Sequence, residues 1–158
     1  MKWMRSTIER SWASIVLLID VHLLLYAHLK LSPFHERTRA WLDEQLRSNQ
    51  RIGMPWLSLL GFLRVSTNPR ALIRAESVAG ALKQMQEWLA HDRVWVPEPT
   101  EGHHEVLADL LLPLDIGGNS VPDAHLAALA IEHGLVLCSN DRGFARFSNL
   151  RWMNPLAE

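Results

Sequence analysis

Two runs of consecutive apolar residues stand out in the hydrophobic pattern of the chain. Residues 15–19 (Ile-Val-Leu-Leu-Ile) form the first run and residues 135–138 (Leu-Val-Leu-Cys) form the second. Uninterrupted apolar runs of this length are typical of parallel strands that are covered on both faces. We therefore predict buried strands over residues 15–19 and 135–139. Shorter patterns predict additional strands at residues 51–54, at 94–96 and, at an edge of the sheet, near 151–153.

Between these strands, apolar residues recur at three- and four-residue spacing, which predicts helices. The expected helices cover residues 23–28, a segment beginning at Ser32-Pro33, a segment beginning at Pro55, residues 77–91, residues 100–111 and residues 121–133. Gly134 follows the last of these at the position where a left-handed residue commonly ends a helix. The alternation predicts one α/β domain with a central parallel sheet of four to five strands and helices on both faces.

The composition of the chain excludes several kinds of site but does not identify one. The chain has 158 residues, which suits one domain with one core. Its net charge of −1 means that any phosphate-binding surface must be a local group of Arg and Lys. The single cysteine, Cys138, excludes an internal disulfide and a multi-thiolate zinc site, and we expect it to be buried. His103 and His104 are adjacent, so they cannot easily share a metal, and we expect both on the surface.

The N-terminal segment differs from the remainder of the chain. Residues 1–14 mix basic and acidic side chains with large apolar ones, and we interpret them as an appended arm, either helical or disordered. The domain is then expected to cover residues 15–158. Asp20 and His22 interrupt the apolar stretch that follows the arm, so the stretch is too short to span a bilayer. We expect a cytoplasmic protein without a membrane association.

Three aspartates lie where predicted elements begin or end. Asp20 directly follows the first buried strand, Asp141 follows the strand at 135–139, and Asp123 lies just inside a helix. In a parallel sheet, the ends of strands and the starts of helices meet at one rim, where ligands bind. Carboxylates gathered there repel one another, and a bound divalent cation removes that repulsion. The pattern therefore predicts a hard-cation site, for which Mg²⁺ is well suited.

Each aspartate also has a structural alternative. Ser120 and Asp123 have the spacing of a helix capping box. Asp141 suits a turn, or a cap for a short helix that contains Phe144. Asp20 has few simple structural uses, because it lies between an apolar strand and an apolar helix.

Neighbouring polar residues extend the predicted site. Affinity for nucleic acid rests largely on contacts with phosphate, so basic residues near the acids matter. Arg142 adjoins Asp141 and is the best candidate for a contact with substrate. Ser139 is expected to hydrogen-bond either a metal ligand or a substrate phosphate, and His22 is a candidate for lining the site.

Several segments together resemble a known family. Residues 16–27, 121–130 and 137–144 resemble acidic motifs of PIN-domain proteins, and residues 62–70 and 150–156 resemble the VapC toxin branch. The resemblance covers about residues 15–157. It implies an Mg²⁺-dependent endoribonuclease, with Mn²⁺ able to substitute, that acts as the toxin of a toxin–antitoxin pair. It also implies an RNA substrate, an inhibitory VapB-like antitoxin and a homodimer. By position, Asp20, Asp123 and Asp141 would be the metal-binding and catalytic acids.

The chain departs from the family pattern at three positions. Gly61 replaces the usual glutamate, His22 replaces an asparagine, and Gly143 replaces an additional acid. The loss of the glutamate favours a one-metal site, unless Glu98 or Glu101 takes its place. Two other functions therefore remain open. One is a weakened nuclease that mainly binds antitoxin or operator-bound complexes, and the other is an unrelated α/β domain for a small phosphorylated ligand.

Overall fold

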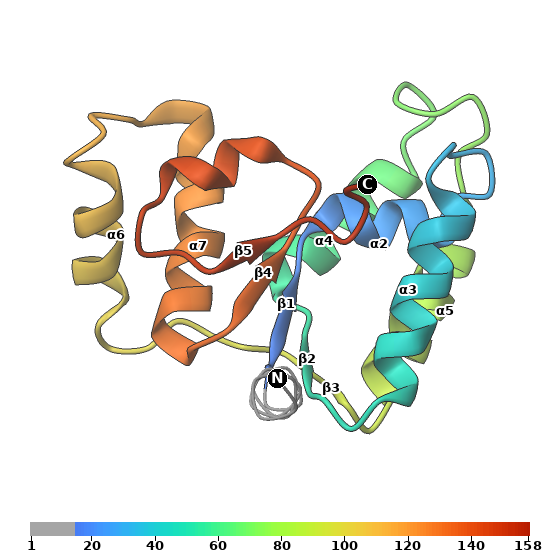
Figure 1. The fold of residues 1–158 in the computed structure, drawn as a ribbon. Coiled ribbons are helices and arrows are strands. Elements are labelled where there is room, and N and C mark those ends of the chain that lie inside the picture. The colour runs from blue at the N-terminus through green and yellow to red at the C-terminus, as the bar shows by residue number, and fades with distance from the viewer. Residues whose placement is uncertain (1–14) are drawn as a thin grey trace.

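The computed structural model describes residues 15–158, so the predicted arm at residues 1–14 lies outside the described part. Five parallel strands form one sheet in the order β3-β2-β1-β4-β5 (Figure 1). The strands are β1 (Leu17–Ile19), β2 (Ile52–Gly53), β3 (Val94–Trp95), β4 (Val136–Cys138) and β5 (Trp152–Met153). The predicted parallel α/β sheet of four to five strands is confirmed.

Helices cover both faces of the sheet, as predicted (Figure 1). The first face carries α2 (Val21–His28), α3 (His35–Arg47), α4 (Trp56–Ser66) and α5 (Val78–Ala90). The second carries α6 (His103–Leu111), α7 (Val121–His133) and the short 3₁₀ helix η2 (Arg142–Arg146), and a 3₁₀ turn, η1 (Gly118–Ser120), leads into α7. Within residues 15–158, no helix combines the length and the apolar character needed to cross a bilayer.

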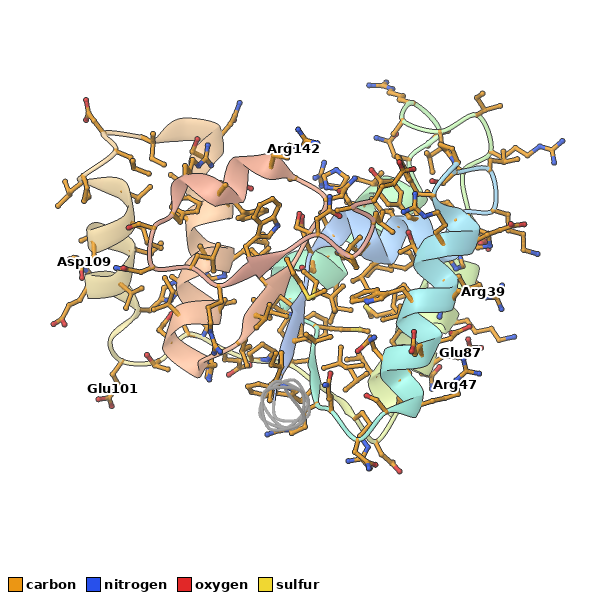
Figure 2. The ribbon with its side chains drawn as sticks, in the orientation of Figure 1. Arg39, Arg47, Glu87, Glu101, Asp109 and Arg142 are labelled. Atoms are coloured by element: carbon orange, nitrogen blue, oxygen red, sulfur yellow. The ribbon has the colours of Figure 1, made fainter. Side chains whose placement is uncertain are left out.

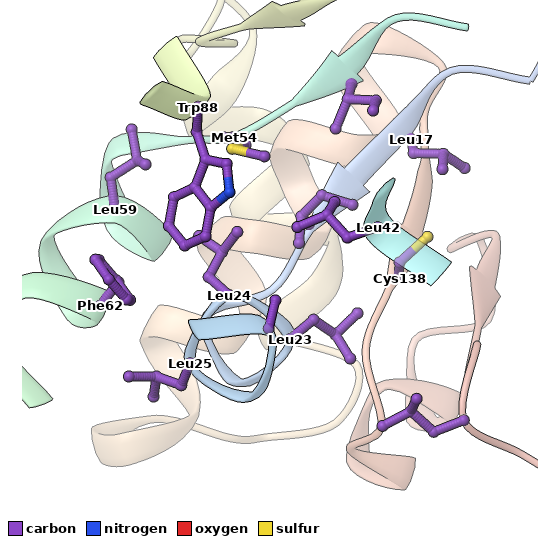
Figure 3. Close-up of a cluster of buried hydrophobic side chains, with 14 of the residues drawn as sticks. Leu17, Leu23, Leu24, Leu25, Leu42, Met54, Leu59, Phe62, Trp88 and Cys138 are labelled. Carbon is purple, nitrogen blue, oxygen red and sulfur yellow. The ribbon is translucent and has the colours of Figure 1, made fainter. Parts of the chain in front are cut away.

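The core is divided in two by the central strands. Leu17 and Ile19 face the α2–α5 side, whereas Leu18 between them faces α7. This alternation follows from the pleat of a strand, and it explains why β1 is apolar at every position. Figure 3 shows the larger cluster, in which Trp88 of α5 and Phe62 of α4 lie over the leucines of α2. The helices on both faces of the sheet therefore pack against β1, and Asp20 directly follows this strand.

The ends of the helices correct two of the expectations. The helix expected from Ser32-Pro33 begins at His35, because Ser32 forms a turn in which its side chain accepts from the Phe34 amide. The capping box at Ser120 and Asp123 is also wrong. Ser120 already has helical angles as the last residue of η1, and its side chain makes no capping hydrogen bond.

The predictions for Gly134 and Cys138 are confirmed, and those for the two adjacent histidines differ in outcome. Gly134 ends α7 with a φ of 65°, as predicted. Cys138 is completely buried, and burial raises the pKa of its thiol. His104 is exposed, but the surface position expected for His103 is wrong. The His103 side chain is only 14% exposed, because it lies between Glu132 and His125 and contacts both.

Candidate active site

Asp20 is held in a fixed orientation where β1 and β4 end. The two strands pair in parallel, and the Asp20 amide donates to the Cys138 carbonyl at 3.1 Å. This pairing places Ser139 beside Asp20, and the Ser139 hydroxyl donates to Asp20 Oδ2 at 2.6 Å. The Val21 amide donates to Oδ1 at 2.8 Å, so Asp20 is also the N-cap of α2. The Asp20 side chain is only 10% exposed, and both of its carboxylate oxygens accept hydrogen bonds.

Ser139 connects two of the three acids. Its hydroxyl oxygen accepts from the Asp141 amide at 3.0 Å while its proton goes to Asp20. Of the two roles that the sequence left open for Ser139, the hydrogen bond to a candidate metal ligand is present. The side chain is completely buried, so a substrate phosphate does not reach it in this structure.

Asp141 lies on the rim and also caps a short helix, which was its structural alternative. Its Oδ1 accepts from the Gly143 amide at 2.8 Å, so it caps η2, the short helix that contains Phe144. The cap uses one carboxylate oxygen. The other has no hydrogen-bond partner among residues 15–158, so capping does not prevent Asp141 from binding a ligand.

Asp123 lies in the first turn of α7 and faces the other two acids. Burial raises the pKa of the Asp123 carboxyl. The positive charge of Arg146, whose Nη2 lies 3.0 Å from Asp123 Oδ2, opposes this, and the negative charges of Asp141 and Asp20 raise the pKa further. The three carboxylates therefore interact electrostatically, as expected from the topology of the sheet.

His22 is a fourth polar group on the rim. Its side chain is about half exposed, and Nδ1 lies 3.9 Å from Asp20 Oδ2. The pKa of His22 is raised, chiefly by Asp20 and also by the charges of Asp141 and Asp123, while burial acts in the opposite direction. His22 therefore faces the same three acids, in agreement with its predicted place near the site.

The donor set suits a hard cation, although the acids do not converge on one point. Within residues 15–158, no three His, Cys, Asp or Glu side chains lie close enough together to hold an ion directly. Mg²⁺ does not require such convergence, because it usually binds one or two carboxylates and keeps several waters. Asp123 Oδ1 and Asp141 Oδ2 have no partner within the described residues, so both are available to such an ion.

The position of the missing glutamate is closed by packing. Gly61 lies where α4 approaches α2, and a Cβ atom added there would lie 2.9 Å from Val21 Cγ2. Real Cβ atoms essentially never approach so closely, so even alanine would require the neighbour to shift. Val21 follows Asp20 directly, so the closed position adjoins the rim.

Neither Glu98 nor Glu101 replaces that glutamate. The Glu98 carbonyl hydrogen-bonds His133, and the segment after Glu98 is held by Glu132 through Thr100, so both glutamates lie at the C-terminal end of α7. Asp123 lies at the other end of α7, about 14 Å from Glu132 at 1.5 Å per residue. Figure 2 likewise places Glu101 and Arg142 at opposite ends of this layer.

Two arginines of η2 differ in their contacts. Arg142 is exposed next to Asp141, and among residues 15–158 no ion pair or hydrogen bond occupies its side chain. Arg146, at the other end of η2, pairs with Asp123. The sequence pattern predicted a role for Arg142 but gave no sign of the Arg146–Asp123 ion pair, which depends on how η2 packs against α7.

The protein is a five-stranded parallel α/β domain that carries acidic side chains where β1 and β4 end. This combination is the architecture of an α/β domain with an acidic site at the rim of its sheet. A model of the PIN domain matches residues 17–150. The chain is 38% identical to ribonuclease VapC37 of Mycobacterium tuberculosis over 140 residues, which are 89% of this chain and 97% of that protein. It is 35% identical to ribonuclease VapC33 of the same organism over 139 residues, 88% of this chain and 97% of that protein. The chain therefore belongs to the PIN-domain family and is similar to its VapC ribonucleases.

Solved structures agree on the fold. One is VapBC2 from Rickettsia felis bound to a DNA fragment from its promoter, with a TM-score of 0.67 and 19% identity, covering 89% of this chain and 98% of that one. Another is VapBC-1 from nontypeable Haemophilus influenzae, with a TM-score of 0.64 and 18% identity, covering 90% of this chain and all of that one. At such low identity, these structures show a shared fold.

Proposed function

We propose that this protein is a metal-dependent endoribonuclease and the toxin of a toxin–antitoxin pair. One observation carries the proposal: Asp20, Asp123 and Asp141 lie on one rim and influence one another electrostatically. The names of the curated relatives, which are VapC ribonucleases at 35–38% identity, support the reaction type. The dependence on Mg²⁺, or Mn²⁺ in its place, rests on the chemistry of the three carboxylates.

Each residue has a defined part in the proposed reaction. Asp20 offers a carboxylate whose orientation is held by Ser139 and the Val21 amide, so little reorganisation is needed when a cation binds. Asp123 and Asp141 each offer one oxygen without a partner among the described residues. Bound Mg²⁺ would acidify a water and stabilise charge on the phosphate. Arg142, exposed beside Asp141, would contact the RNA backbone.

One metal rather than two is expected at this site. The additional acid that a second ion would need is absent, because Gly61 occupies its position, and Val21 would crowd any Cβ atom placed there. The same observation favours the second candidate function, a weakened nuclease that mainly binds antitoxin or operator-bound complexes. Cleavage by purified protein separates the two functions.

A VapB-like antitoxin is the expected partner. The solved relatives are VapBC assemblies, which supports such a partner for this chain. The surface also offers space for a peptide segment, in a cavity of about 1280 Å³ between α2, α3, α5 and the loop after α4. Its apolar lining includes Leu42, Leu46 and Trp88. Mixing with the adjacent gene product should therefore give a stable complex, and expression of the toxin alone should arrest growth.

A homodimer and a cytoplasmic location stay predictions. Three exposed apolar residues on α4, Trp56, Leu57 and Leu60, are compatible with a contact between two copies. Light scattering during size-exclusion chromatography would give the mass of the particle, and a monomer at micromolar concentration would contradict the predicted homodimer.

The central experiment uses protein that has been purified free of antitoxin. We expect Mn²⁺ to raise its melting temperature and to support cleavage of structured RNA. Asp20→Asn and Asp123→Asn should lose both effects, whereas Asp109→Asn, an exposed site on α6, should keep them. Wild-type protein that neither cleaves RNA nor gains stability from Mn²⁺ would favour the binding-only function.

A further inference from the structure

Arg146 already pairs with one oxygen of Asp123, an acid that the proposed cation needs. Its Nη2 lies 3.0 Å from Asp123 Oδ2, with both side chains about one third exposed. The guanidinium also lies over the Phe147 ring, 4.9 Å from its centroid. Phe147 is buried, so the ring is a fixed support for the cation. The contact therefore holds a positive charge against the acidic rim.

The positive charge of Arg146 compensates part of the repulsion among the three acids of the rim. Asp20 and Asp141 both raise the pKa of Asp123, and the charge of Arg146 offsets part of their effect. A divalent cation on the rim would supply the same compensation, with twice the charge. It would also repel the guanidinium. Although Asp123 Oδ1 is open to an ion, the metal and Arg146 therefore oppose each other electrostatically at this carboxylate.

We propose that Arg146 exchanges with the metal: it neutralises Asp123 when no cation is bound, and once released it binds a phosphate of the RNA. This inference rests on the proposed nuclease function and assigns a role to a residue outside the acidic set. A released guanidinium cannot move far, because η2 has five residues and begins directly after Asp141 on the same rim. A guanidinium matches phosphate with two parallel N–H bonds, so a phosphate held at the rim is its natural next partner.

The exchange predicts opposite effects on two measurements. Arg146→Ala should bind Mn²⁺ more tightly by about two- to five-fold, the range expected when a partly exposed ion pair no longer competes. It should bind RNA more weakly, and the slope of log affinity against log salt should become shallower by about 0.7–0.9, as for one lost phosphate contact on a single or a double strand. A purely structural role would weaken both, so tighter metal binding is the distinguishing sign.

The experiment measures Mn²⁺ by calorimetry and electron paramagnetic resonance, without RNA. RNA binding is followed by fluorescence anisotropy with Ca²⁺ in place of Mn²⁺, and a gel confirms that the RNA stays intact. Arg39→Ala is the matched control, since Arg39 is also a partly exposed arginine paired with an aspartate, Asp43, but lies on α3 away from the rim (Figure 2). Arg146→Lys, which keeps the charge, should stay near wild type for Mn²⁺. Circular dichroism verifies folding.

The possible outcomes distinguish a failure of the exchange from a failure of the nuclease function. If the wild type binds Mn²⁺ and cleaves RNA but Arg146→Ala binds Mn²⁺ no more tightly, the exchange is wrong and the function stands. If only Arg146→Ala binds Mn²⁺, the exchange stands and the wild-type function fails. If neither binds Mn²⁺, both fail. Tighter Mn²⁺ binding with unchanged RNA affinity and salt slope would overturn the phosphate contact alone.

Discussion

The hydroxyl of Ser139 offers the sharpest test of how the rim is built. Ser139→Ala removes the donor to Asp20 Oδ2 and the acceptor of the Asp141 amide in one change. The site is completely buried, so water cannot easily replace the lost hydroxyl. We therefore expect a substantial loss of stability together with weaker metal binding, because Asp20 loses the contact that orients it.

The size of the expected stability loss in Ser139→Ala depends on the charge of the acceptor, the Asp20 carboxylate. A hydrogen bond to a charged group contributes about 1.5–3 kcal/mol, against about 0.5–1.5 kcal/mol for a neutral pair. For a domain of this size, each kcal/mol shifts the melting temperature by about 2–4 °C, so Ser139→Ala should lower it by about 3–12 °C. The total stability of such domains is about 5–15 kcal/mol, so the variant should still fold.

Ser58→Ala is the matched control. Ser58 is equally buried and donates to the Ile19 carbonyl at 2.8 Å, next to Asp20, but its acceptor is neutral. Urea denaturation at neutral pH gives the free energy of unfolding of each variant, and titration with Mn²⁺ gives the metal affinity of each. The reasoning is refuted if Ser139→Ala costs no more than Ser58→Ala, or if it binds Mn²⁺ as tightly as the wild type.

Three other perturbations test separate features. Gly61→Ala should destabilise the protein to urea by up to about 2 kcal/mol, because overpacking against Val21 exceeds the gain in helix propensity, and the same change should stabilise a Val21→Ala background. Burial raises the pKa of Glu132, but hydrogen bonds from Thr100 and His103 outweigh it and hold that pKa below its ordinary value. The stabilisation from these hydrogen bonds is therefore complete above the unfolded pKa of Glu132 and lost as pH falls through its folded pKa. In thermal melts, Glu132→Gln should cost stability at pH 7, and the cost should shrink as the pH falls below the ordinary range of a glutamate. Gly134→Ala should lower the free energy of unfolding by about 1 kcal/mol, because its φ of 65° disfavours a side chain; no loss in urea denaturation would contradict this.

Much of the fold could be predicted from local pattern. The apolar runs that became β1 and β4 are long enough to indicate strands covered on both faces, and the alternation with helices then requires parallel pairing. That topology alone brings Asp20, Asp123 and Asp141 to one rim. The start of α3 could not be predicted in the same way, since a serine before a proline suits a turn as well as a helix cap.

The sequence by itself determined that three acids share a rim and that the usual glutamate is absent, because both depend on the order of elements and on residue identity. Only the tertiary structure decided what surrounds those acids. It buries Ser139 between two of them, pairs Arg146 with Asp123, and closes the position of Gly61 with Val21. It also places Glu98 and Glu101 at the far end of α7. These contacts join residues that are mostly distant in sequence, and they depend on how helices pack across the sheet, which spacing along the chain does not encode.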